Sequence, residues 1–187
     1  MMNKKLTLIG ITGKARSGKD TVGNYIKGMH NFNTYAFADP IKKAASIMFG
    51  IPLDYFYDDE HKERIVSQWD LSPRQIMQTL GTEGGRDLFR QDIWVKRGEI
   101  EWANFCANNQ YRSGLIFTDV RFENEAEMIR LNGGHIIHIE RENVTKVNEH
   151  ISEQGITFNL KDIVIHNDKT KEDLFKRVDD IMKKLGV

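Results

Sequence analysis

The sequence predicts an α/β fold of three layers, in which a parallel β-sheet is covered by helices on both faces. Two observations predict it. Short apolar runs rich in β-branched residues alternate with segments of helical spacing, and a glycine-rich loop follows the first of these runs. The 187 residues match the usual size of one domain, about 100–200 residues, and the composition shows no break. We therefore expect one domain over residues 1–187.

The first four elements are expected in the order strand, helix, strand, helix. Residues 6–12 form an apolar run bounded by glycine, which is typical of a buried central strand in a parallel sheet. Apolar side chains at helical spacing in 22–29 predict a helix that ends near Gly28. Residues 34–38 predict a second strand, and Pro40 suits the first turn of the next helix.

A helical insertion is expected over approximately residues 40–110, where no strand signal interrupts the pattern. Within it, Ser72, Pro73 and Gln75 combine an N-cap serine, a proline at the first helical position and a glutamine placed to close a capping box. A helix should therefore begin at this serine. We expect that helix to end at Gly81.

The alternation of strands and helices returns after the insertion. Residues 115–118, 135–139 and 163–165 predict three further strands, with a helix over 123–131 and a last helix near the end of the chain. Residues 140–161 are polar and too numerous for an ordinary connection. We expect this segment to be a lid beside an active site.

The loop after the first strand satisfies the pattern G-x-x-x-x-G-K through Gly13, Gly18 and Lys19. It lies between a predicted buried strand and a helix, as a phosphate-binding loop (P-loop) requires; a glycine-rich turn without a ligand is the alternative. Its N–H groups can surround a β-phosphate while the lysine reaches the β- and γ-oxygens. Asp20 and Thr21 stand where a Ser or Thr usually binds Mg²⁺. We expect Asp20 to hold Mg²⁺ directly or through water, with a helix-capping role as the alternative.

Charge and motif content disfavour several function classes, although a local basic cleft is left open. Lys and Arg total 27, as do Asp and Glu, which disfavours a nucleic-acid binder that depends on a strong positive field. The guanine-reading Asn-Lys-x-Asp element of GTPases does not occur in the sequence. His135 and His138 are three apart on a predicted strand, so they face opposite sides and cannot chelate one metal.

The cysteine and the hydropathy pattern bear on where the protein works. Cys106 is the single cysteine, which excludes an internal disulfide and fits a reducing interior. We expect its side chain to pack against its helix. No apolar stretch approaches the roughly 20 residues that span a bilayer. These features favour a cytoplasmic protein.

Seven short motifs follow one another along almost the whole chain. They are RSGKDT at 16–21, ADPIK at 38–42, RQIMQTLGT at 74–82, WV at 94–95, TDVR at 118–121, HISE at 150–153 and VIHND at 164–168. In this order they resemble the phage deoxynucleoside monophosphate kinases, a group within the P-loop nucleoside monophosphate kinases. The resemblance implies a three-layer P-loop kinase fold with a helical acceptor-binding insertion and a lid.

The resemblance also implies a donor site for ATP and Mg²⁺. The cofactor-binding residues would be Gly13, Arg16, Ser17, Gly18, Lys19, Asp20, Thr21 and, near the adenine, Asn167. The catalytic residues would be Lys19, Arg16, Arg121 and the lid residue Arg141, and the metal ligands Asp20 and Asp119. His150 and Glu153 would order the closed lid, with solvated loop residues as the alternative.

The acceptor site implied by the resemblance draws on the insertion and on one strand end. Asp119 and Arg121 follow an apolar strand, at the edge where open α/β sheets bind ligands, and a guanidinium can grip a phosphate with two hydrogen bonds. Surface ion pairs of Arg121 with Glu123 or Glu125, and core packing of Trp94, are the alternatives. The full set of expected substrate-binding residues is Ile41, Lys42, Arg64, Arg74, Gly81, Thr82, Trp94, Asp119, Arg121 and Glu125.

The expected activity is transfer of the γ-phosphoryl group of ATP to the 5′-phosphate of a deoxynucleoside monophosphate. A P-loop kinase for another small acceptor, such as dephospho-coenzyme A, is the nearest alternative. A nucleotide-dependent switch or ATPase is a more distant one. The expected partners are small nucleotides, with no stable binding to nucleic acid or membranes; a homodimer is left open.

Overall fold

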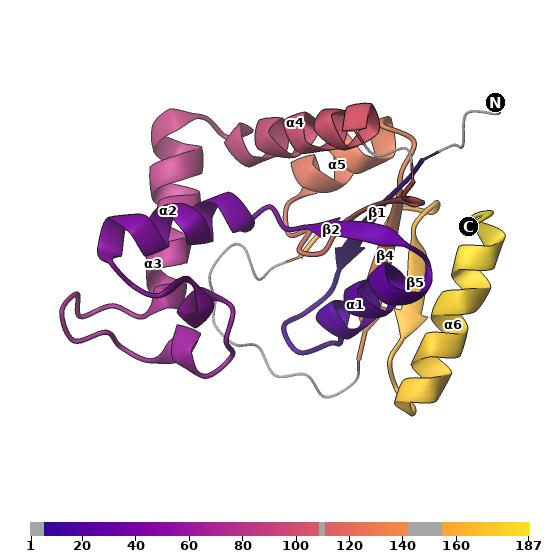
Figure 1. The fold of residues 1–187 in the computed structure, drawn as a ribbon, viewed down its shortest axis with the longest axis horizontal. Coiled ribbons are helices and arrows are strands. Elements are labelled where there is room, and N and C mark those ends of the chain that lie inside the picture. The colour runs from indigo at the N-terminus through magenta and orange to yellow at the C-terminus, as the bar shows by residue number, and fades with distance from the viewer. Residues whose placement is uncertain (1–5, 109–110, 142–154) are drawn as a thin grey trace. The chain divides into compact units, whose positions relative to one another are not determined.

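The computed structural model describes residues 6–108, 111–141 and 155–187 (Figure 1). The chain forms two compact units. The first, here called the sheet unit, comprises Met1–Ala36 and Gly98–Val187, and the second, the helical unit, comprises Phe37–Arg97. The helical unit begins three residues before the expected insertion and ends at Arg97 rather than near residue 110.

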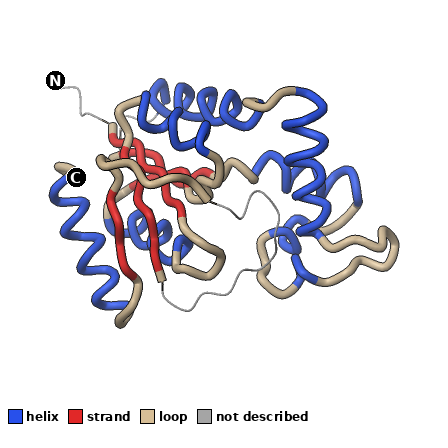
Figure 2. The backbone as a smooth tube through the Cα atoms, turned by 180° about the vertical axis from the view of Figure 1, so that it is seen from behind, coloured by secondary structure: helices blue, strands red, loops and turns tan. Residues whose placement is uncertain are grey.

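The sheet unit contains five parallel strands in the order β2-β3-β1-β4-β5. Figure 2 shows them side by side. Their bounds are Thr7–Thr12 for β1, Phe32–Tyr35 for β2, Gly114–Phe117 for β3, His135–Glu140 for β4 and Ile163–His166 for β5. The parallel α/β prediction is therefore confirmed. Because β1 is central and its neighbours come later in the chain, its carboxyl end lies at the switch point where such sheets bind ligands.

Helices cover both faces of this sheet (Figure 1). Helices α1 (Lys19–Met29) and α6 (Lys171–Lys184) lie on one face, where Ile9 and Ile11 pack with Val22 and Leu174. Helix α5 (Glu123–Leu131) lies on the other. Gly10 faces α5, and a Cβ there would lie 2.7 Å from the side chains of Ile129 and Ile136. Successive residues of β1 point to opposite faces of the sheet, so they pack against different helices.

The second strand differs from its predicted bounds. It begins at Phe32, two residues earlier than expected, because this ring is fully buried in the core that α1 and α6 share. It ends at Tyr35, since Ala38 already has right-handed helical torsion angles as the residue preceding α2. Residues 36–38 therefore lead out of the sheet instead of extending it.

The helical unit is built from short helices around a small core of Ala45, Ile51, Phe56 and Ile76. Its elements are α2 (Asp39–Phe49), the 3-10 turns η1 (Leu53–Phe56) and η2 (His61–Glu63), α3 (Pro73–Thr79), the π-helix η3 (Leu80–Phe89) and the start of α4 (Ile93–Asn108). Within the described ranges, no helix is long and apolar enough to cross a membrane.

The predicted start of α3 is confirmed, but its predicted end is wrong. Ser72 Oγ accepts the N–H of Gln75 at 3.3 Å, and Gln75 Oε1 accepts the N–H of Ser72 at 2.8 Å. The helical path then continues past Gly81, which does not take the positive φ of a glycine cap. Instead, its carbonyl accepts the indole N–H of Trp94 at 2.7 Å.

One expectation about α4 is also wrong. Cys106, expected to pack against its helix, is exposed. The spacing of apolar residues placed it correctly on a helix. Which face of that helix is covered depends on the rest of the fold.

Candidate active site

The P-loop connects β1 to α1 through unusual backbone conformations. Gly13 and Gly18 have φ of 144° and 107°, and Arg16 has φ of 62°. A Cβ at residue 13 would lie 2.4 Å from the carbonyl oxygen of Ile139 on the neighbouring strand. Only glycine fits this position, because both the torsion angle and the space exclude a side chain.

Lys19 begins α1 and lies folded across the loop. Its Nζ donates to the carbonyl oxygens of Gly13 and Lys14, both at 2.7 Å. An anionic phosphate oxygen is a stronger acceptor than a neutral carbonyl. The ammonium is therefore held where it can exchange these carbonyls for the oxygens of a nucleotide.

Asn167, predicted to lie near the adenine, contacts the P-loop in this structure. Its Nδ2 donates to the carbonyl oxygen of Ser17 at 2.8 Å, and its N–H donates to the carbonyl of Glu140 at 2.7 Å. A Cβ on Gly18 would lie 2.5 Å from the Asn167 amide nitrogen. The asparagine thus joins the end of β5 to the P-loop; an adenine contact stays a prediction.

The side chain of Ser17 is the most enclosed polar group of the loop. It is 1% exposed, and its Oγ is buried with no hydrogen-bond partner among the described residues. Buried hydroxyl groups are normally paired, since an unpaired one loses its bonds to water. A ligand held by the loop could supply the missing partner.

Asp20 and Thr21 lie in the first turn of α1. Gly18 is the N-cap residue, and no side chain caps this helix. Within the described ranges, the exposed carboxylate of Asp20 has no hydrogen-bond partner, so the capping alternative does not hold. Mg²⁺ in kinases commonly uses one or two carboxylates together with substrate phosphates, which this free carboxylate beside the P-loop fits. The part of the chain described here holds no cluster of three or more His, Cys, Asp or Glu residues suited to a metal.

The segment after β3 carries Asp119 and Arg121 at the carboxyl edge of the sheet. Glu125 Oε2 accepts the N–H of Arg121 at 2.9 Å and that of Phe122 at 3.2 Å. Its side chain is 2% exposed. The carboxylate is thus buried and fixes the backbone at Arg121, while a contact of Glu125 with substrate stays a prediction.

We expect Glu125→Ala to lower the free energy of unfolding by about 1–3 kcal/mol, because two N–H groups would lose their acceptor inside the protein. Urea denaturation measures this change. Glu127→Ala, at an exposed position of the same helix, is the matched control and should change stability by less than about 0.5 kcal/mol. Equal effects of the two substitutions would show that the Glu125 hydrogen bonds contribute nothing specific.

A pocket of about 460 Å³ joins the P-loop to the strand ends of the sheet unit. It brings together Gly13, Arg121 and Arg141, three residues that the sequence analysis assigned to the site. The other lining residues are Thr12, Lys14, Val120, His138, Ile139, Glu140, Gly155, Ile156, His166 and Asp168. Two cations thus face the same cavity as the P-loop, as a polyphosphate site requires.

Three predicted phosphate-binding cations lie in the helical unit, each beside a carboxylate. Lys42 Nζ lies 3.8 Å from Asp39 and 3.9 Å from the centre of the Tyr57 ring. Arg74 Nε donates to Glu63 Oε1 at 2.7 Å. Arg64 pairs with Glu60. A monophosphate would have to displace or share these carboxylates, so the roles of the three cations stay predictions.

The remaining predicted acceptor residues surround the π-helix. Besides its bond to Gly81, the Trp94 ring lies 2.7 Å from where a Cβ of Gly85 would stand. Ile41 is buried and its Cδ1 lies 3.0 Å from the Cβ position of Gly81. The indole therefore packs on two glycines of the π-helix, where Thr82 also lies. This contact matches the packing alternative for Trp94, while base stacking stays a prediction.

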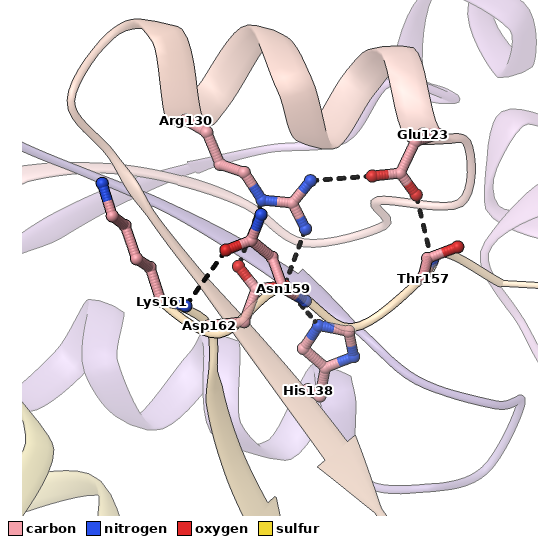
Figure 3. A network of polar contacts seen from close by, with 7 residues as sticks. All are labelled: Glu123, Arg130, His138, Thr157, Asn159, Lys161 and Asp162. Atoms are coloured by element: carbon pink, nitrogen blue, oxygen red, sulfur yellow. Dashed lines mark hydrogen bonds and ion pairs between the residues drawn. The ribbon is translucent and has the colours of Figure 1, made fainter.

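Two expected lid residues, His150 and Glu153, lie outside the described residues. The sequence analysis missed the charged network of Arg130, Asp162 and Glu123 beside the pocket (Figure 3). No local pattern could have revealed it, because Arg130 and Asp162 are 32 residues apart. His138, considered only as a metal ligand, belongs to the same network.

Comparison with known proteins relates this sequence to one protein family. The sequence profile described as deoxynucleotide monophosphate kinase matches residues 7–54 and 52–178. A putative deoxynucleotide monophosphate kinase of Acanthamoeba polyphaga mimivirus is 30% identical over 183 residues, covering 92% of this chain and 94% of the relative. The deoxynucleotide monophosphate kinase of Enterobacteria phage T4 is 25% identical, covering 96% of this chain and all of the relative.

A solved structure supports the fold independently. A crystal structure of a Thermus thermophilus protein superposes with a TM-score of 0.53 at 15% identity and covers 97% of this chain and 99% of its own. At this identity the likeness concerns the fold alone. With a P-loop at the switch point of the sheet and a profile that matches most of its length, the chain belongs to the deoxynucleotide monophosphate kinase family.

Proposed function

We propose that this protein transfers the γ-phosphoryl group of ATP to the 5′-phosphate of a deoxynucleoside monophosphate. The bond between the γ-phosphorus of ATP and the oxygen that bridges it to the β-phosphorus breaks. A new bond forms between an oxygen of the acceptor phosphate and the γ-phosphorus. The products are ADP and a deoxynucleoside diphosphate. The observation that carries the proposal is the P-loop: its Gly13 and Lys14 line one pocket with Arg121, and Lys19 bonds the carbonyls of these two loop residues, in a chain of this family.

The P-loop would bind the donor. The N–H groups of the loop and the positive end of α1 favour the β-phosphate, and Lys19 would move from the carbonyls of Gly13 and Lys14 to the β- and γ-oxygens. Arg16 is exposed on the loop, and Arg141 lines the pocket. Both guanidinium groups are candidates to neutralise charge on the transferring group.

The chemistry that a bound Mg²⁺ would supply is neutralisation of negative charge on the phosphate oxygens. Asp20 is the carboxylate placed to hold this ion, directly or through water, and Asp119 is the second candidate. Thr21 would then contact a phosphate. A hard cation prefers such anionic oxygen ligands.

The phosphate of the acceptor would be held at the strand end after β3. Arg121 can hold the monophosphate with two hydrogen bonds from a backbone that Glu125 keeps in place. Lys42, Arg64 and Arg74 are the further phosphate candidates, and Gly81, Thr82 and Trp94 are candidates for contacts with the sugar or base. No general base is needed, because the acceptor phosphate is already ionised near neutral pH.

The decisive experiment measures ADP release with ATP, Mg²⁺ and each ribo- and deoxynucleoside monophosphate in turn. We expect turnover with at least one deoxynucleotide. Dephospho-coenzyme A serves as the alternative acceptor. Turnover with that compound alone, or ATP hydrolysis that no acceptor stimulates, would contradict the proposed function.

We expect Asp20→Ala to raise the Mg²⁺ concentration that gives half-maximal rate, because the ion would lose an anionic ligand or a partner of its bound water. A titration of Mg²⁺ at saturating ATP and acceptor measures this. Asp180→Ala, an exposed carboxylate on α6, is the control and should leave the titration unchanged. An unchanged Mg²⁺ dependence in the Asp20 variant would remove Asp20 from the metal site.

A further inference from the structure

Residues 155–162 form a described segment, here called the return arm, that leads into β5. Two of its N–H groups are fixed by carboxylates: Thr157 donates to Glu123 Oε2 at 3.0 Å, and Asn159 donates to Asp162 Oδ2 at 3.0 Å. Figure 3 shows both bonds. The return arm is therefore attached to α5 through Glu123 and folded onto its own carboxyl end through Asp162.

Asp162 lies at the centre of this network. Its side chain is only 2% exposed, and it accepts the Nε and Nη2 groups of Arg130 at 3.1 and 2.6 Å. His138 Nε2 lies 2.9 Å from the same carboxylate. Arg130 also donates Nη1 to Glu123 at 2.8 Å, so one guanidinium links both carboxylates. Helix α5, strand β4 and the return arm meet at this one group.

The pKa values of Asp162 and Arg130 are shifted in the directions expected for an ion pair. Burial by itself would raise the pKa of Asp162, but hydrogen bonds from Arg130 and His138 outweigh it and hold the pKa below its ordinary value. The pKa of Arg130 is raised, chiefly by its hydrogen bond to Asp162. A buried carboxylate in a fully hydrogen-bonded setting is rigid, because any rotation leaves donors unpaired.

The same network borders the nucleotide pocket. His138 lines the pocket and packs edge to face against Phe158 of the return arm, with ring centres 5.5 Å apart. Gly155 and Ile156, at the start of the arm, line the pocket together with Gly13 of the P-loop. Where the arm lies therefore sets the shape of one wall of the cavity that contains the P-loop.

We propose that Asp162 is a positioning residue for phosphoryl transfer: by holding Arg130 and His138 it fixes the return arm as a wall of the pocket beside the P-loop, and so sets the affinity for the donor nucleotide. This inference rests on the proposed function. Without the anchor, the arm would have to be ordered each time a nucleotide binds, and that ordering subtracts from the binding free energy. The chemical step itself would be little affected, because Asp162 touches no reacting group.

The test is Asp162→Asn, which keeps the size of the side chain but loses its charge and one acceptor oxygen. We expect the KM for ATP and the Kd for ADP to rise about tenfold, with kcat changed less than about threefold. Steady-state rates and calorimetric titration with ADP measure these values. Unchanged KM and Kd, or a fall in kcat alone, would overturn the proposal, because either result describes a merely structural role.

Two further variants make the test specific. Glu123→Gln weakens the more exposed end of the same network and should raise the KM for ATP by a smaller factor. This variant keeps the proposal testable if Asp162→Asn does not fold. Asp179→Asn is the matched control. Asp179 accepts Tyr25 Oη and lies 2.9 Å from His30 Nε2, joining α1 to α6 away from the pocket lining. It should lower stability without raising KM; an equal rise in KM would overturn the proposal.

Hydrogen exchange separates this inference from the proposed function. In Asp162→Asn, amides of the return arm should exchange faster than in the wild type, most of all at Asn159, whose N–H loses its charged acceptor. This measurement and the ADP titration need no acceptor. If the wild type phosphorylates no monophosphate, the proposed function fails, but these two measurements still test whether Asp162 fixes the return arm. Unchanged exchange in the arm would overturn the anchor itself.

Discussion

Lys19→Met is expected to lower kcat by about 10²–10³ with the fold retained. Methionine keeps much of the length and apolar volume of lysine but removes the charge that would meet the β- and γ-oxygens. Loss of one such preorganised group usually has an effect of this size. Because the Lys19 ammonium bonds to the loop carbonyls of Gly13 and Lys14 and lies outside the apolar core, we expect the thermal transition to shift by a few degrees at most.

The control is Lys27→Met, which removes the same charge from the exposed last turn of the same helix and should leave kcat unchanged. Steady-state rates at saturating substrates, together with circular dichroism of each variant, measure both expectations. A folded Lys19→Met protein with nearly wild-type turnover would remove this lysine from the mechanism.

Arg121→Ala is expected to lower kcat/KM for the monophosphate by about 10²-fold or more, while ATP affinity changes less than about threefold. The guanidinium would grip the acceptor phosphate with two hydrogen bonds, and its loss would also misalign the attacking oxygen. Arg121→Lys should recover only part of the activity, because a point charge cannot reproduce the planar geometry.

Arg121 lines the same pocket as Gly13 of the P-loop, so the test must distinguish a contact with the acceptor from a contact with the donor. Binding titrations with each nucleotide, run beside steady-state rates, show which substrate it serves. Arg112→Ala, at an exposed position where the side chain bonds Asn31, is the control and should change neither affinity. A collapse of ATP binding with monophosphate binding intact would assign Arg121 to the donor.

Local patterns in the sequence determined much of this protein. The alternation of strands and helices, the P-loop and the capping box at Ser72 were all predicted, because each depends on residues a few positions apart. The family was also evident from the order of short motifs. Glu125 was named as an expected substrate-binding residue and as an alternative ion-pair partner of Arg121, yet its burial was not foreseen, since exposure depends on what packs around α5.

Only the tertiary structure decided the features that join distant parts of the chain. Asn167 reaches the P-loop at Ser17 across 150 residues, and Asp162 meets His138 and Arg130 across 24 and 32 residues. Gly81 was predicted to end a helix, but Trp94 occupies the space beside it and the helical path continues. Within the sheet unit, the strand order β2-β3-β1-β4-β5 brings residues such as Asn167 and Ser17 together. The spacing of residues in the sequence does not predict these contacts, because they form when apolar faces are buried against elements that are distant along the chain.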